Sequence, residues 1–172
     1  MQLAYVIAPG RGDTDLILAG LAADLTARGL RLCGTVQINT ERVTDGPCDM
    51  DVRVLPDGPV LRISQDLGPH AQGCRLDPAA LETAVGLVAA RLDPETDLLI
   101  VNKFGKHEAE GRGFRDVIAE ALGLGIPVLV GLNGLNRAPF EAFSGGMATA
   151  LPPDRAALAA WAESALGREV TA

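Results

Sequence analysis

Residues 9–14 have the residue types and spacing of a loop that binds phosphate groups. They follow the apolar run 3–8 and precede an amphipathic helical pattern. The consensus of such loops is G-x-x-x-x-G-K-[ST], whose backbone N–H groups surround the phosphates while the lysine reaches the outer ones. Aligned on Gly12, this chain keeps the final threonine but has Ile7 at the first glycine and Asp13 at the lysine. We therefore expect the loop geometry to persist and the chemistry of ATP hydrolysis to be lost.

A second loop, residues 102–113, follows the most apolar strand pattern of the chain, residues 98–101. It carries Lys103, Lys106 and Arg112 in a protein whose formal net charge is −7. Ligands of open parallel sheets bind beyond the carboxyl ends of the strands, so two neighbouring strands would bring both loops to one crevice. N–H groups at a helix start, together with two or three cations, suit a phosphate or another tetrahedral oxyanion.

The predicted ligand-binding set combines the two loops. It comprises Gly10, Arg11, Gly12, Asp13, Thr14, Lys103, Lys106, His107, Glu108 and Arg112. Two alternatives stay open: the first loop is a tight turn in which Asp13 caps the helix, and the second is a solvated loop with weakly paired charges. Residues 133–137 follow the apolar strand 127–130 and reach the same end of the sheet, where they line the crevice or form a plain turn.

Other kinds of site have weaker support in the sequence. We predict no catalytic residue, because Ser64 and Ser144 lack the G-x-S-x-G context of a serine nucleophile. Cys48, Met50 and Cys74 suggest a soft metal such as copper(I), with ordinary packed or surface cysteines as the alternative. Their spacing matches no zinc pattern, so the metal content is left open.

The composition limits the classes of function. With 172 residues, the chain is expected to form one domain over 1–172. A net charge of −7 argues against a general nucleic-acid or anionic-membrane binder. The sequence has no run of 18 apolar residues and no basic segment followed by a long apolar stretch, so neither a membrane span nor a secretory signal is expected. Three cysteines do not make a disulfide framework, and we therefore predict a cytoplasmic protein.

Short apolar strands alternate with amphipathic helices, which predicts an α/β fold with a doubly wound, mainly parallel sheet. Strands are expected at 3–8, 31–38, 98–101 and 127–130, and helices at 14–28, from Asp77 onward, at 113–123 and around Trp161. The alternating residues 50–64, with Pro56 and Gly58 between the two runs, predict a β-hairpin insert at an edge.

The order of these segments resembles that of the small P-loop nucleoside-triphosphatases. Residues 104–108 match the Ile-Gly-Lys-x-Glu type of segment that follows the central strand in those enzymes, whereas Asn102 stands where they have a magnesium-associated acid. Residues 73–77 and 102–115 look more specifically like a bacterial family of unknown function related to those enzymes, whose members tend to be encoded near molybdate-transport genes. The resemblance covers nearly the whole chain. The residues that carry over from it by match are Gly10, Gly12, Thr14, Lys106 and Glu108.

The resemblance and the basic second loop together lead to a functional expectation. We expect a non-hydrolysing, P-loop-derived protein that binds an oxyanion or a phosphorylated small molecule, with molybdate as the candidate ligand and a role in molybdenum homeostasis. One alternative is an active nucleoside-triphosphatase in which Arg11 or a lysine of the second loop replaces the lost cation. Another is an interaction protein with a vestigial nucleotide pocket. A small anion is expected as the partner, ahead of nucleotide–magnesium, and a homo-oligomer stays open.

Overall fold

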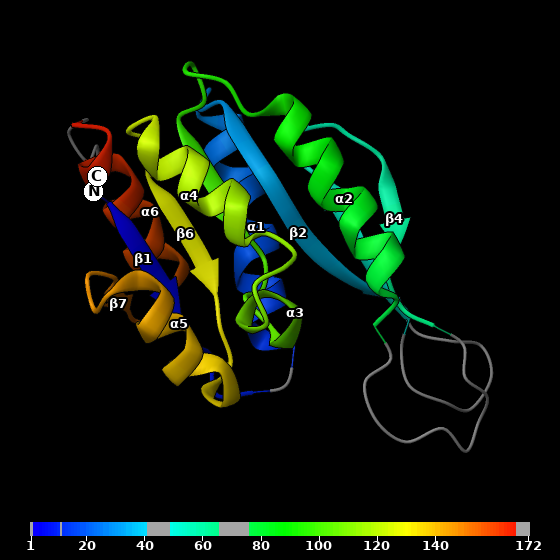
Figure 1. Cartoon of the computed structure of the whole chain (residues 1–172). Coiled ribbons are helices and arrows are strands. Elements are labelled where there is room, and N and C mark those ends of the chain that lie inside the picture. Colours follow the sequence, from blue (N-terminus) through cyan, green and yellow to red (C-terminus); the bar gives the residue numbers. More distant parts are fainter. Residues whose placement is uncertain (1, 11, 41–48, 66–75, 168–172) are drawn as a thin grey trace.

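A computed structural model of the chain describes residues 2–10, 12–40, 49–65 and 76–167, and within them seven strands form one sheet (Figure 1). The strands are β1 (Leu3–Val6), β2 (Leu32–Thr40), β3 (Asp49–Val54), β4 (Val60–Arg62), β5 (Leu98–Val101), β6 (Val128–Gly131) and β7 (Thr149–Leu151). Their spatial order is β4-β3-β2-β5-β6-β1-β7. The neighbours from β2 to β7 pair in parallel, while β3 and β4 add an antiparallel hairpin at one edge. The predicted mainly parallel α/β fold and its hairpin are confirmed.

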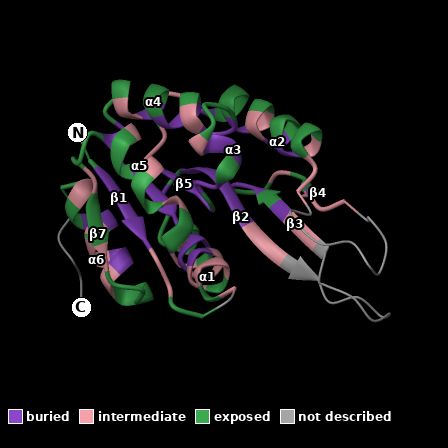
Figure 2. Cartoon of the chain, turned by 60° about the horizontal axis from the view of Figure 1, so that its bottom comes forward, coloured by how far each residue is buried: buried purple, intermediate pink, exposed green. Residues whose placement is uncertain are grey.

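Helices cover both faces of the sheet (Figure 2). They are α1 (Asp13–Ala27), α2 (Pro78–Arg91), α3 (Lys106–Ala109), α4 (Arg115–Gly123), α5 (Arg137–Ser144) and α6 (Arg155–Ala165), with a 3₁₀ turn η1 (Gly134–Asn136) before α5. Leu18 of α1 and Leu158 of α6 pack with Ile100 on one face. Val88 of α2, Ile118 of α4 and Phe140 of α5 belong to the core on the other face. No helix in the described ranges is long and apolar enough to cross a membrane.

Local sequence signals explain where the central elements begin and end. All four residues of β5 are fully buried, as expected of a strand with a helical layer on each side. Asp77 caps α2 by accepting hydrogen bonds from the N–H groups of Ala79 and Ala80, and Pro78 occupies the first helical turn. The parallel neighbours β5, β6 and β1 have their carboxyl ends on the same side of the sheet. The loops that leave these three strands therefore lie together on that side.

Candidate functional site

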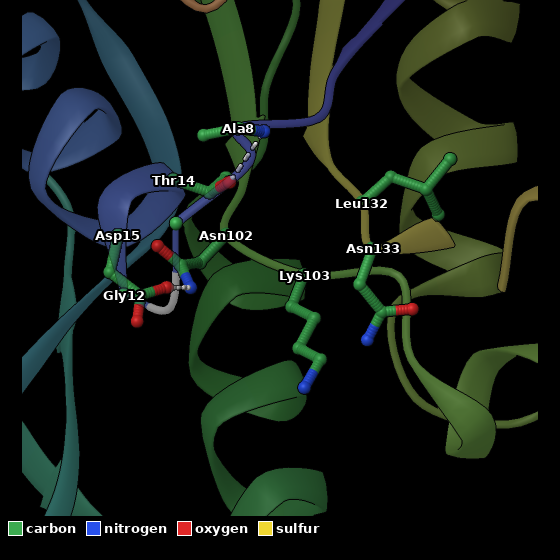
Figure 3. Close-up of a pocket in the computed structure, with 9 residues that line it drawn as sticks. Ala8, Gly12, Thr14, Asp15, Asn102, Lys103, Leu132 and Asn133 are labelled. Atoms are coloured by element: carbon green, nitrogen blue, oxygen red, sulfur yellow. Dashed lines mark hydrogen bonds between the residues drawn. The ribbon is translucent and has the colours of Figure 1, made fainter. Parts of the chain in front are cut away.

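A cavity of about 220 Å³ opens where β1, β5 and β6 end (Figure 3). The loop after β1, the first residues after β5 and the first residues after β6 all contribute to its wall. It is lined by Ala8, Gly10, Gly12, Thr14, Asp15, Asn102, Lys103, Leu132 and Asn133. The two loops singled out by the sequence thus meet in one cavity, and the segment that begins at Asn133 joins them.

The loop after β1 is closed by hydrogen bonds of its own. The Ala8 N–H donates to the Thr14 hydroxyl oxygen at 3.1 Å, and the Asp13 N–H donates to the Gly10 carbonyl oxygen at 3.2 Å. Gly12 has a φ of 81° and is the N-cap residue of α1, so Asp13 is the first residue inside the helix. The suggestion that Asp13 caps the helix is therefore wrong, whereas a tight turn without a ligand stays an alternative for this loop. The Asp13 carboxylate lies so close to Gly10 that a Cβ there would be 2.0 Å from Asp13 Oδ2.

A polar network joins the end of β5 to α1 and β2 at the wall of the cavity. Asn102 is 4% exposed, and its Oδ1 accepts the backbone N–H of Gln37 at 3.0 Å. Because a backbone N–H can only donate, this contact fixes the orientation of the carboxamide and directs its Nδ2 to Asp15. Asn102 Nδ2 donates to Asp15 Oδ1 at 2.9 Å, and Gln37 Nε2 donates to Asp15 Oδ2 at 3.4 Å. Asn102 was singled out from the sequence, whereas Asp15 and Gln37 were not predicted as site residues.

Lys103 is the cation that the described residues bring to this cavity. In Figure 3 it lies between Asn102 and Asn133 at the cavity wall. Its side chain is exposed and forms no ion pair within the described part of the chain. Lys106 is also exposed, but it begins α3 and does not line the cavity. Arg11, the other cation of the first loop, lies outside the described residues.

His107 and Arg112 line a different hollow, of about 570 Å³, between α2 and α4. His107 is buried, and its Nε2 lies 2.6 Å from Glu82 Oε1, which also accepts the Gly113 N–H at 2.9 Å. Arg112 pairs with Glu110 at 2.6 Å. After α3 the backbone takes left-handed values at Gly111 and Gly113, with a φ of 66° at Gly113. The structure therefore separates these two residues from Lys103.

Residues 3–161 match the family described as protein of unknown function DUF2478. The chain belongs to this family. It is also 36% identical over 160 residues to a protein of Bradyrhizobium diazoefficiens named molybdenum import ATP-binding protein ModC 2. That match covers 93% of this chain but 18% of the relative, so the chain spans less than a fifth of the relative's length.

Two solved structures share the fold of this DUF2478 chain. One is the solution structure of a human cancer-related nucleoside triphosphatase, with a TM-score of 0.63, 19% identity and 87% of each chain covered. The other is the crystal structure of THEP1 from Aquifex aeolicus, with a TM-score of 0.64, 16% identity, and 97% and 98% of the two chains covered. The predicted membership of a family of unknown function is confirmed by the family match, and the predicted likeness to nucleoside-triphosphatases is confirmed at the level of the fold.

Glu108, one of the motif residues carried over from the resemblance, is a buried residue of the second loop in this DUF2478 chain. Its Oε1 accepts the Gly105 N–H at 3.1 Å, whereas its Oε2 is buried without a hydrogen-bond partner among the described residues. Burial raises the pKa of the Glu108 carboxyl above its ordinary value. The residue supports the turn at Gly105 and does not line the cavity.

The substitution Glu108→Gln is expected to stabilise the protein at pH 8 and to leave its stability nearly unchanged at pH 4. Since the folded-state pKa of Glu108 is raised, its stabilising contribution is fully present below the unfolded-state pKa, which is about 4.3, and is lost as the pH rises through the folded-state value. A glutamine stays neutral throughout. Urea unfolding of both proteins across this pH range measures the difference. The exposed Glu110→Gln variant is the control, and an equal gain for both variants would contradict the assignment.

Proposed function

We propose that this DUF2478 protein binds a small tetrahedral oxyanion or a phosphorylated small molecule in the 220 Å³ cavity and does not hydrolyse nucleoside triphosphates. The observation that carries the proposal is that the loop between β1 and α1 and the Lys103 side chain line the same cavity. Backbone N–H groups at the start of a 15-residue helix favour a negative charge, and a lysine ammonium adds a charged hydrogen bond.

The size of the cavity favours a small anion over a nucleotide. Pockets for drug-sized ligands have volumes of roughly 300–1,000 Å³. The cavity here has about 220 Å³, which suits a single tetrahedral group. Asp13 places a carboxylate where a phosphate loop carries its lysine, and this charge repels the outer phosphates of a triphosphate.

Molybdate is the candidate ligand. The relative from Bradyrhizobium is named for molybdenum import, and it contains a segment that is 36% identical to nearly the whole of this chain. We therefore propose a role in molybdenum homeostasis, in which this protein binds molybdate in the cytoplasm. The whole relative's activity is not transferred, since the matched segment is 18% of its length.

A second candidate is an active nucleoside-triphosphatase. The specific observation in its favour is the fold shared with a nucleoside triphosphatase over 87% of both chains. The loop threonine is kept at Thr14, on the wall of the cavity. The cation that such chemistry uses is missing at position 13, and we therefore rank this candidate second.

A thermal-shift series is expected to separate these functions. Molybdate, tungstate, sulfate and phosphate are compared with ATP and GTP, because a ligand at 100 times its Kd stabilises the folded state by about 2.7 kcal/mol. We expect molybdate to raise the Tm more than either nucleotide. The variant Lys103→Ala should weaken oxyanion binding by roughly 1.5–3 kcal/mol, the scale of a charged hydrogen bond.

Lys106→Ala is the matched control, since Lys106 is an exposed lysine of the same loop that does not line the cavity. Calorimetric titration of both variants with molybdate gives the affinities. Equal weakening in both variants, or none in either, would contradict the site. Stabilisation by nucleotides alone would favour the second candidate. The absence of any ligand effect would favour an interaction protein with a vestigial pocket.

A further inference from the structure

Asn133 lines the cavity from the segment that follows β6, and its carboxamide is held in one orientation. Its Oδ1 accepts the backbone N–H of Asn136 at 3.1 Å and the Asn136 Nδ2 at 3.0 Å. A backbone N–H can only donate, so the oxygen of Asn133 must be the atom that faces Asn136. The Asn133 Nδ2, with its two N–H donors, is therefore the atom that faces the other way.

This amide nitrogen is turned to the cavity and has no partner from the protein. In the view of Figure 3, the nitrogen of Asn133 points toward Lys103 and the oxygen points away from it. Asn133 is half-buried, and within the described ranges neither its Nδ2 nor the Lys103 ammonium has a hydrogen-bond or ion-pair partner. Two strand ends thus each bring an unused donor to the same cavity.

We propose that Asn133 is a direct ligand of the oxyanion and donates to it from Nδ2. This inference rests on the oxyanion function proposed above and adds an uncharged donor to the Lys103 cation. The backbone N–H groups of the loop after β1, the Lys103 side chain after β5 and the Asn133 side chain after β6 would then bind the anion from three strand ends.

The two side chains would recognise different properties of the anion. The ammonium of Lys103 carries a charge, so its contribution depends on the charge of the anion and on the salt concentration. The carboxamide of Asn133 is neutral, so its contribution depends on an oxygen that can accept a hydrogen bond. Both groups can only donate to the ligand, and they therefore select oxygens that carry no proton. Molybdate and sulfate have four such oxygens, whereas hydrogen phosphate has one oxygen that is protonated.

Two substitutions at this position separate the donor from the turn that the residue supports. Asn133 is the N-cap residue of η1, and serine and aspartate are favoured caps that can accept the same backbone N–H. Asn133→Ser removes the amide donor. Asn133→Asp puts a carboxylate oxygen in place of the amide nitrogen at almost unchanged size. Both variants are therefore expected to fold, and circular dichroism checks this.

Calorimetric titration with molybdate, sulfate and inorganic phosphate at neutral pH measures the effect. Asn133→Ser should weaken molybdate binding roughly 10- to 100-fold, which corresponds to one hydrogen bond to a charged group. Asn133→Asp should weaken molybdate and sulfate binding further, because like charges repel. It should weaken phosphate binding less, because a carboxylate accepts the O–H of hydrogen phosphate. The ratio of phosphate affinity to molybdate affinity should therefore rise above its value in Asn133→Ser, an effect that a disturbed turn alone does not produce.

Leu135→Asp is the matched control for the added charge. Leu135 lies on the same turn, is 90% exposed and does not line the cavity. Solvent and salt screen a charge at such a position, so this variant should bind molybdate within about threefold of the parent protein.

Nuclear magnetic resonance tests the contact directly. The side-chain amide signals of Asn133 are identified by their absence from the spectrum of Asn133→Ser, and in the parent protein they should shift saturably as molybdate is added. Glycerol phosphate is titrated in the same way. If it binds more tightly than inorganic phosphate and shifts the same signals, the inference holds and the ligand is a phosphorylated small molecule.

The outcomes separate the inference from the function on which it rests. Anion binding that depends on Lys103 but is unchanged in both variants at position 133 overturns the inference and leaves the oxyanion function standing. Equal losses of molybdate and phosphate affinity in Asn133→Asp, or amide signals that do not move on binding, overturn it in the same way. A parent protein that binds none of these anions removes the oxyanion function, and the inference fails with it.

Discussion

Purified protein supplied with Mg²⁺ is expected to release no phosphate from ATP or GTP above the level of a mock preparation. Phosphoryl transfer depends on cations that balance the charge of the transferring group, and one such group contributes a factor of roughly 10³–10⁵ to the rate in related systems. This chain has Asp13 in place of the loop lysine, which exchanges a positive charge for a negative one.

The measurement is phosphate release over several hours, with Lys103→Ala and Lys106→Ala prepared in parallel. These variants distinguish a contaminating phosphatase from turnover by the protein itself, because contamination does not depend on either lysine. Turnover that disappears in one of them, or in Arg11→Ala, would show that another cation replaces the lost lysine. The nucleoside-triphosphatase candidate would then be correct.

The central elements of the fold were predictable because their signals are local. An uninterrupted apolar run marked β5, a proline after a capping aspartate marked α2, and alternation marked the hairpin. By contrast, β7 has only three residues, of which Thr149 and Ala150 are exposed, so its sequence has no apolar pattern that predicts a strand. It is a strand because β1 offers a free edge on that side, where Ala4 pairs with Thr149.

The helix α5 was not predicted from the sequence either. Asn133 and Gly134 precede it and indicate a turn, and the helix itself has only eight residues. The signal that could have found it is the pair Phe140 and Phe143, spaced three residues apart. Phe140 is fully buried, and its ring centroid lies 5.2 Å from the ring centroid of Phe104.

The candidate site was predictable only in part, since its network joins residues that are far apart in sequence. The Asn102 side chain bonds Gln37 across 65 residues and Asp15 across 87 residues, and no local pattern specifies such contacts. In the sequence, Asp15 is one of two acids in a helical first turn. Conversely, His107 is close to Lys103 in sequence, yet it lines the hollow between α2 and α4. Cys48 and Cys74, of the soft-metal hypothesis, lie outside the described residues.

The substitution Gly34→Ala is expected to destabilise the fold strongly. Gly34 lies in β2 with a φ of 114°, and a Cβ there would be 1.8 Å from the carbonyl oxygen of Ile100 in β5. A disfavoured backbone conformation costs about 1–3 kcal/mol, and displacing packed neighbours costs about 1–3 kcal/mol more. The expected loss of roughly 2–6 kcal/mol is a large part of the 5–15 kcal/mol that stabilises typical domains.

Gly29→Ala is the matched control, because Gly29 also has a positive φ, of 86°, but has no atom within 4 Å of the added Cβ. It should lose only the conformational part, about 1–2 kcal/mol. Guanidinium unfolding of the two variants and the parent protein gives the difference. Equal stability of the two variants would contradict this prediction, because it would mean that β2 and β5 move apart at little cost in free energy.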